Sequence, residues 1–171
     1  MMSLTISTVA NSAIEQMFSA LDGVLAKAAA HAEAKGVEEA VYLNWRLAPD
    51  MFSLVRQVQV ATELPARSLS RLAGADMPSF ADDETSIADL RDRIKKARDH
   101  IKSLDVEALD ADLDGPISFP AGGDNEMTLP RRAYLLNMIL PNLYFHVTAT
   151  YAILRQLGVE IGKRDFLAVP G

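Results

Sequence analysis

The chain has 171 residues, of which 49% are hydrophobic, and this composition fits one folded domain over residues 1–171 rather than a disordered segment. Its formal net charge of −6 argues against a protein that binds nucleic acid, because a duplex binder needs a basic face to displace counterions from phosphates. The lack of cysteine excludes disulfides, thiolate nucleophiles and cysteine-bound zinc or iron–sulfur clusters within the chain.

The first predicted element is a helix over about residues 7–31. Apolar residues recur along it at helical spacing, and Gly36 follows as a residue that can end a helix. Residues 1–9 lack the basic stretch and the long apolar core of a signal peptide. No apolar run approaches the roughly 18 residues that indicate a membrane span. We therefore expect a cytoplasmic protein with no membrane partner.

Two further helices are predicted in the middle of the chain. The second helix begins at Pro49, where the missing N–H costs nothing, and ends at Gly74. Pro65 lies inside it and predicts a kink or break, because proline removes one backbone hydrogen bond. The third helix follows acidic residues 82–84 and carries apolar residues at spacings of three and four up to Leu104. Its other face is charged, which is typical of a surface in contact with solvent.

A hairpin and a fourth helix complete the predicted fold. Residues 115–130 alternate apolar and polar side chains on both sides of a glycine-containing turn at 121–125, which predicts a short β-hairpin that leans on the helices. The fourth helix is predicted over about residues 130–156, with an interruption at Pro141. Together these elements predict an all-α, four-helix bundle with a short β-hairpin insert before the last helix. The competing layout is a three-helix core whose first helix is exchanged between two copies.

Four polar residues are predicted on core-facing sides of two helices. On a helical wheel, Asn142 and His146 share the apolar stripe of the fourth helix, and Asp50 and Gln57 share that of the second. A buried polar group left unpaired costs about 1–3 kcal/mol, so each of these side chains needs a partner. Two interpretations stay open. The residues form a polar pocket that binds a small ligand or a metal, or they form a satisfied hydrogen-bond network that fixes helix register.

The rest of the sequence gives no signature of a reaction. It has no nucleophile elbow, phosphate-binding glycine loop or calcium loop. His31 ends the first helix, where a cation interacts well with the helix dipole, and His100 lies off the apolar stripe, where we expect it to be solvated. The catalytic residues therefore stay unknown, with His146 and Asp50 as the candidates.

Three segments carry a resemblance to a known family. They are RLAPDMF at 46–52 with Gln57 behind it, PNLYFH at 141–146 with AILR at 152–155, and GVEIGKRDFL at 158–167. These segments resemble a bacterial domain family of unknown function, DUF1993, which is itself similar to the DinB/YfiT-like four-helix bundle superfamily. The resemblance covers nearly the whole chain and implies an up-down-down-up bundle that is often dimeric.

The same resemblance implies where a metal site would lie. Many superfamily members hold a divalent metal with one histidine from the second helix and two, four residues apart, from the fourth; some are thiol-dependent transferases or isomerases. In this sequence the pair falls on Asn142 and His146, and the second-helix position falls on Asp50 or Gln57. Amide side chains are poor ligands for zinc or nickel. We therefore expect no cofactor, with His146 and Asp50 as the only, weak candidates for holding a divalent metal.

These observations predict an uncharacterised DinB-like bundle protein that binds a small ligand or a partner and has a degenerate metal site. The alternative is a metal-dependent enzyme, or one in which Asp50 orients His146 as a general base acting on a small substrate. A purely structural subunit is a third interpretation. We also expect a homodimer formed through the face of the fourth helix that carries Tyr144 and Tyr151. The C-terminal tail around Phe166 could cover that face instead.

Overall fold

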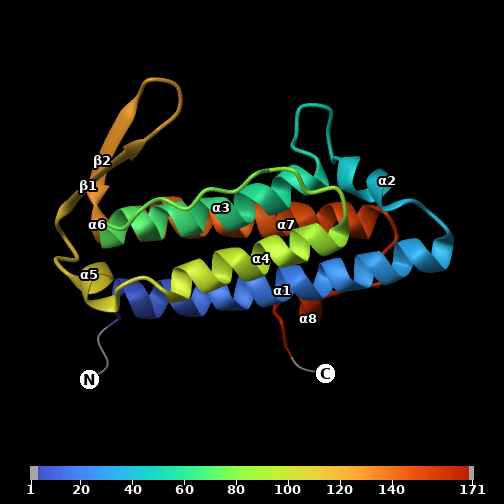
Figure 1. The fold of residues 1–171 in the computed structure, drawn as a ribbon, viewed down its shortest axis with the longest axis horizontal. Coiled ribbons are helices and arrows are strands. Elements are labelled where there is room, and N and C mark those ends of the chain that lie inside the picture. Colours follow the sequence, from blue (N-terminus) through green and yellow to red (C-terminus); the bar gives the residue numbers. More distant parts are fainter. Residues whose placement is uncertain (1–3, 170–171) are drawn as a thin grey trace.

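The structure, a computed structural model, describes residues 4–169 and is built around long helices (Figure 1). These are α1 (Ile6–Lys35), α3 (Leu54–Ala73), α4 (Ile87–Lys102) and a last helix made of α6 (Arg131–Tyr134), η1 (Leu135–Ile139) and α7 (Leu140–Gln156). Both α1 and α3 pack against α4 and α7, so the long helices surround one core. In Figure 1, α1 and α7 run in one direction and α3 and α4 in the other. The predicted four-helix bundle is confirmed, and the three-helix alternative is wrong because α1 packs into the bundle of its own chain.

Some helix ends agree with the boundaries predicted from local sequence signals, and others do not. Gly36 and Gly74 adopt left-handed φ angles of 62° and 64° and end α1 and α3, as predicted. However, α3 begins at Leu54 rather than at Pro49, and it runs through Pro65 without a break. The third long helix also begins later than predicted, at Ile87, after the capping box formed by Ser86 and Asp89.

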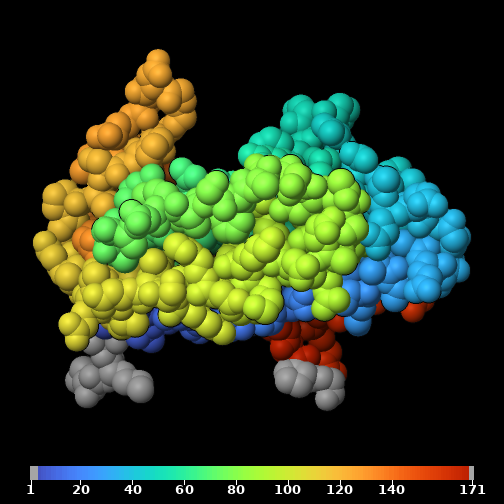
Figure 2. Space-filling model, viewed as in Figure 1, coloured from blue at the N-terminus to red at the C-terminus, as the bar shows by residue number. Residues whose placement is uncertain are grey.

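Shorter elements connect or cover the bundle. They are α2 (Glu39–Asn44), α5 (Val106–Asp110), β1 (Pro116–Pro120), β2 (Glu126–Pro130) and α8 (Lys163–Phe166). The three short helices were not predicted from the sequence. The strands form the predicted antiparallel hairpin, which projects from one end of the molecule (Figure 2). Phe119 of β1 is only 3% exposed and stacks on Tyr134, with 4.3 Å between ring centroids, so it ties the hairpin to the bundle.

The connection from α3 to α4, residues 75–86, crosses the outside of the bundle and is held by a buried arginine. Arg93 of α4 is only 2% exposed, and its Nη1 lies 2.8 Å from Asp82 and 2.7 Å from Glu84. Its guanidinium lies over the ring of Phe80, 4.5 Å from the centroid. The expectation that the charged side chains of this helix face solvent is therefore wrong for Arg93.

The last helix changes its hydrogen-bonding pattern where the sequence predicts an interruption. Its η1 segment is π-helical, and Pro141 follows in the first turn of α7, where it contributes no N–H. The side-chain amide of Asn142 donates to the Met138 carbonyl at 2.7 Å. Short π-helical turns occur frequently at functional sites, and this one borders the cavity described below.

The C-terminal tail covers part of the face that we expected to form a dimer. Phe166 of α8 packs edge-on against Tyr151, with 5.9 Å between ring centroids, and Asp165 pairs with Lys27 of α1 at 2.6 Å. Tyr144 lies on the same helix and stays 40% exposed. No helix within residues 4–169 is long and apolar enough to cross a membrane.

Candidate functional site

Gln57 of α3 and His146 of α7 meet between their helices. His146 Nδ1 and Gln57 Oε1 are 2.7 Å apart, and Gln57 Nε2 donates to the Phe52 carbonyl at 3.2 Å. Because the amide nitrogen of Gln57 is engaged by a carbonyl, its oxygen faces the imidazole and can only accept, so Nδ1 of His146 carries the proton. In the neutral ring, Nε2 is then an acceptor with a free lone pair.

The Nε2 atom of His146 is not fully buried, and two aromatic rings flank the imidazole. Phe52 stacks on the imidazole at 6.3 Å between centroids, and Phe145 meets it edge-on at 5.2 Å. These phenylalanines are 50% and 56% exposed, whereas His146 is 7% exposed. Within residues 4–169, Nε2 has no hydrogen-bond partner, and it is not among the buried atoms that lack one. It is therefore available to a molecule that enters from outside.

The surroundings of His146 favour the uncharged ring. Burial lowers the pKa of His146 below its ordinary value of 6.5, and the positive charge of Arg56 lowers it further. At neutral pH the imidazole can therefore accept a hydrogen bond or a proton at Nε2.

Asp50 does not share the inward face on which the sequence analysis placed it. It lies in an exposed turn, because α3 begins four residues further on, at Leu54. No hydrogen bond joins its carboxylate to His146 or Gln57 in the part of the chain that the structure describes. The structure thus supports contact for Gln57 and His146 only, and a ligand-binding or catalytic role for Asp50 stays a prediction.

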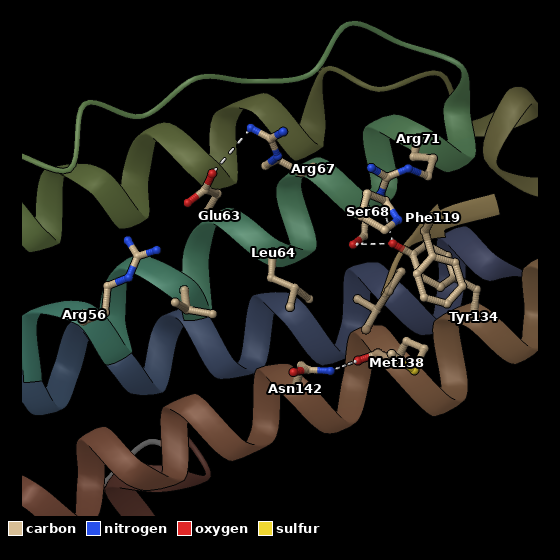
Figure 3. A pocket seen from close by; sticks show the side chains of 13 residues that line it. Arg56, Glu63, Leu64, Arg67, Ser68, Arg71, Phe119, Tyr134, Met138 and Asn142 are labelled. Atoms are coloured by element: carbon tan, nitrogen blue, oxygen red, sulfur yellow. Dashed lines mark hydrogen bonds and ion pairs between the residues drawn. The ribbon is translucent and has the colours of Figure 1, made fainter. Parts of the chain in front are cut away.

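A cavity of about 320 Å³ lies between α3, η1 and the start of α7 (Figure 3), and neither Gln57 nor His146 lines it. Arg56 and Asn142 border one part of it, and both are sequence neighbours of the pair: Arg56 precedes Gln57, and Asn142 lies one turn before His146. The hairpin residue Phe119 and Tyr134 border another part. The apolar lining consists of Val60, Leu64, Phe119, Pro120, Met138 and Ile139.

Most residues of this cavity could not be predicted from the sequence. The helical wheel of α3 identified the apolar face that packs into the core, but the cavity lies beside that face, where charged residues such as Arg67 and Arg71 emerge. Its wall combines hairpin residues Phe119 and Pro120 with side chains of α3, which are far apart in sequence. The available signal was the repeated arginine at 67 and 71, one helical turn apart.

The residues at the superfamily's metal positions do not fit a divalent metal site. In residues 4–169 no group of three or more His, Asp or Glu side chains is placed to hold a metal ion. His146 offers one nitrogen, while Gln57 directs its oxygen at that ring and Asn142 engages its amide nitrogen with a carbonyl. This is a poor set of donors for zinc or nickel.

The other histidines have structural partners. His31 Nδ1 lies 2.7 Å from the Tyr42 hydroxyl, and His100 Nε2 lies 2.7 Å from the Ser70 hydroxyl. The expectation that His100 is solvated is therefore wrong, because it is half-buried against α3.

Comparisons with known proteins agree with this architecture. The model of a domain family of unknown function, DUF1993, matches residues 7–167. The crystal structure of a DinB family member protein from Shewanella denitrificans is similar to this chain, with a TM-score of 0.82 and 36% sequence identity over 92% of this chain and 88% of that chain. None of the curated proteins compared with the chain matches it.

Proposed function

The chain belongs to the DUF1993 family and has a DinB-like fold, and we propose that it binds a small organic ligand in the cavity between α3 and α7. One observation carries the proposal: the cavity of about 320 Å³ is concave and combines an apolar lining with polar and charged side chains. Ligand sites in proteins typically have this character and occupy about 300–1,000 Å³. The volume of this cavity is at the small end of that range, so it suits a small ligand.

In this proposal the metal site of the superfamily is degenerate. Gln57 and His146 keep a hydrogen bond between the same two helices, with the Nε2 atom of His146 open at the surface. Neither side chain lines the cavity, which Asn142, one turn before His146, borders. The pair thus joins the two helices beside the ligand site instead of holding a metal.

A cavity-filling variant tests the proposal. Leu64 lines the cavity and is half-buried, so Leu64→Trp should fill the space. Amide chemical shifts should respond to small aromatic acids and amides at millimolar concentration along α3 and η1, and the response should be lost in Leu64→Trp. Leu136→Trp, at a position 48% exposed and outside this cavity, is the matched control. If no compound perturbs these residues, or if Leu64→Trp leaves the response unchanged, the proposal fails.

A second candidate function is general-base or nucleophilic catalysis by His146. It is favoured by the proton fixed on Nδ1, the lowered pKa and the open Nε2 atom. Gln57, in place of the expected Asp50, would orient the ring. Diethyl pyrocarbonate should acylate His146 faster than His31 or His100, as read by mass spectrometry of digested protein; equal or slower modification of His146 would exclude a reactive imidazole.

We also propose that two copies associate through the exposed face of α7. Tyr144 and Phe145 are 40% and 56% exposed there, and α8 covers Tyr151 but not these residues. Sedimentation at micromolar concentration should show a dimer that Tyr144→Glu weakens and that Val106→Glu, an exposed change on α5, does not. A protein that sediments only as a monomer would contradict this proposal.

A further inference from the structure

The cavity between α3 and α7 has a positively charged lining in a protein whose net charge is −6. Its lining includes Arg56, Arg67 and Arg71, all from α3, against a single carboxylate from Glu63. Arginine stays protonated at any pH at which the protein is folded, so this charge is permanent. A cavity of this kind favours an anion over a neutral ligand of the same shape.

The one lining carboxylate is shared between two arginines. Glu63 Oε1 lies 3.5 Å from Arg67 Nη1, and Glu63 Oε2 lies 3.7 Å from Nη2 of the buried Arg93. The pair with Arg67 is a partly exposed contact between residues one helical turn apart, and such pairs stabilise weakly. Glu63 therefore offsets only part of the positive charge of the three arginines that border the cavity.

Arg71 has no carboxylate partner within residues 4–169. Its Nη1 donates to the Tyr134 hydroxyl at 3.1 Å, and that hydroxyl donates to Ser68 Oγ at 2.9 Å. Tyr134 is only 4% exposed and is held by its stacking on Phe119. A neutral, fixed hydroxyl thus positions the guanidinium of Arg71 at the cavity and leaves its other N–H donors unmatched by negative charge (Figure 3).

Arg56 differs from Arg71. Its Nη1 lies 2.7 Å from Asp82 and 3.1 Å from Gln59 Oε1, so its charge is already paired at the edge of the cavity. The unmatched positive charge is therefore concentrated at the part of the cavity bordered by Arg67, Arg71 and Tyr134. Apolar side chains of Leu64, Met138 and Phe119 line the same space.

We propose that this cavity binds a small organic carboxylate, with the carboxylate held by Arg71 and Arg67 and the apolar body packed against Leu64, Met138 and Phe119. The inference rests on the proposed ligand-binding function and names the chemical class of the ligand. The planar guanidinium of arginine matches a carboxylate through two parallel N–H···O bonds, which gives both attraction and orientation. The apolar lining selects for a hydrocarbon or aromatic body attached to that group.

Matched pairs of acids and amides test the charge separately from the shape. Benzoate and benzamide, and phenylacetate and phenylacetamide, are titrated at millimolar concentration by calorimetry and by amide chemical shifts. We expect each acid to bind at least about tenfold more tightly than its amide, because a charge-assisted hydrogen bond is roughly twice as strong as a neutral one. Arg71→Gln should lower the binding affinity for the acids by about tenfold and leave the affinity for the amides unchanged. Arg67→Gln, on the exposed side of α3, should also lower the affinity for the acids.

Arg91→Gln is the matched control. Arg91 pairs with Asp22 on the surface between α4 and α1, away from this cavity, and its removal should not change acid binding. If acids and amides bind alike and Leu64→Trp abolishes both, the carboxylate assignment is wrong while the proposed ligand site stands. If neither class binds, both are wrong. Acid binding that survives Arg71→Gln and Arg67→Gln, or inorganic phosphate that binds as tightly as the acids, would also overturn the assignment.

Discussion

Two buried polar clusters lie on opposite sides of α3, and they differ in how completely their polar groups are paired. On the α4 side, Arg93 has Glu84 and Asp82 within 2.8 Å of Nη1, and its Nε donates to Thr62. On the α7 side, the imidazole of His146 has one hydrogen-bond partner within residues 4–169, Gln57, and its second nitrogen is not fully buried.

This difference separates the buried polar groups that stabilise the fold from those that are available for function. Around Arg93, the segment 75–86 that crosses the bundle brings two carboxylates and Phe80 to the guanidinium, so the charged groups of this cluster pair with one another. A fully paired cluster of this kind rigidifies the protein and leaves no polar group free to bind a ligand. Around His146 the neighbouring aromatic rings stay half-exposed, and side chains do not fill the cavity that adjoins Asn142. We therefore expect removal of Arg93 to affect stability most, and changes around His146 to affect binding and proton uptake more than stability.

The largest expected effect follows from replacing Arg93. Arg93→Met keeps the apolar stem but removes the charge that Asp82, Glu84 and Glu63 share. Breaking a buried ion pair by removing one partner costs about 3–5 kcal/mol, and we expect the lower end because Asp82 is partly exposed and can rehydrate. Urea unfolding followed by circular dichroism measures the change. Arg91→Met, which removes an exposed ion pair with Asp22, should cost less than about 1 kcal/mol. Equal losses of unfolding free energy in the two variants would show that the Arg93 cluster stabilises the fold no more than an exposed ion pair does.

A smaller effect, with a defined pH dependence, is expected at Glu84. Burial alone would raise the pKa of Glu84, but hydrogen bonds from Arg93 and Gln59 outweigh it and hold the pKa below its ordinary value of 4.5. Because the folded state binds the proton less readily, this carboxylate stabilises the fold above pH 4.5, and the contribution is lost as pH falls through the lowered pKa. Glu84→Gln should therefore lower the free energy of unfolding at pH 7 by about 1–3 kcal/mol. The gap to the parent protein should narrow below pH 4.5, and a gap that does not change with pH would contradict this account.

The contrast between the two clusters also shows what the sequence could predict. Periodic apolar residues and helix-ending glycines predicted the bundle, because both act within one helix and are readable locally. The inward position of Gln57 and His146 followed from the same wheels, and they meet at 2.7 Å. Arg93 could not be identified in this way, since its burial depends on carboxylates and an aromatic ring from a loop without periodicity.

Asp50 shows the opposite error: it was predicted to face inward, but it is exposed. Proline suits a first helical turn, so a helix that begins at Pro49 is predicted, and its helical wheel places Asp50 on an inward face. In the structure, residues 45–53 form an irregular turn before Leu54, so the periodicity does not apply there. The arginine-lined cavity was missed for a related reason: it depends on the position of the hairpin, which no local pattern encodes.

The open cluster should respond weakly to loss of its histidine, with a sign that depends on pH. The lowered pKa of His146 means that the unfolded chain binds a proton that the folded protein does not, so stability falls as pH drops below 6.5 until the folded-state pKa is passed. At pH 8, His146→Leu should cost about 1 kcal/mol, because Gln57 loses one hydrogen-bond donor. As pH falls below 6.5, the variant should gain stability relative to the parent protein. A difference that stays constant from pH 8 to well below 6.5 would contradict a lowered pKa.

The smallest expected effect isolates the contribution of Arg56 to that pKa. Burial is the larger cause of the lowered pKa of His146 and the charge of Arg56 is the lesser one, so Arg56→Gln should raise the pKa without restoring the ordinary value of 6.5. Arg56→Lys keeps a positive charge at the same helical position and should leave the pKa nearly unchanged. Titration of the imidazole ring protons by NMR measures both variants against the parent. If Arg56→Gln restored the pKa to 6.5, the ring would be better solvated than its 7% exposure indicates. If the two variants shifted the pKa equally, the effect would come from lost packing against Phe52, over which the guanidinium of Arg56 lies at 5.9 Å, rather than from charge.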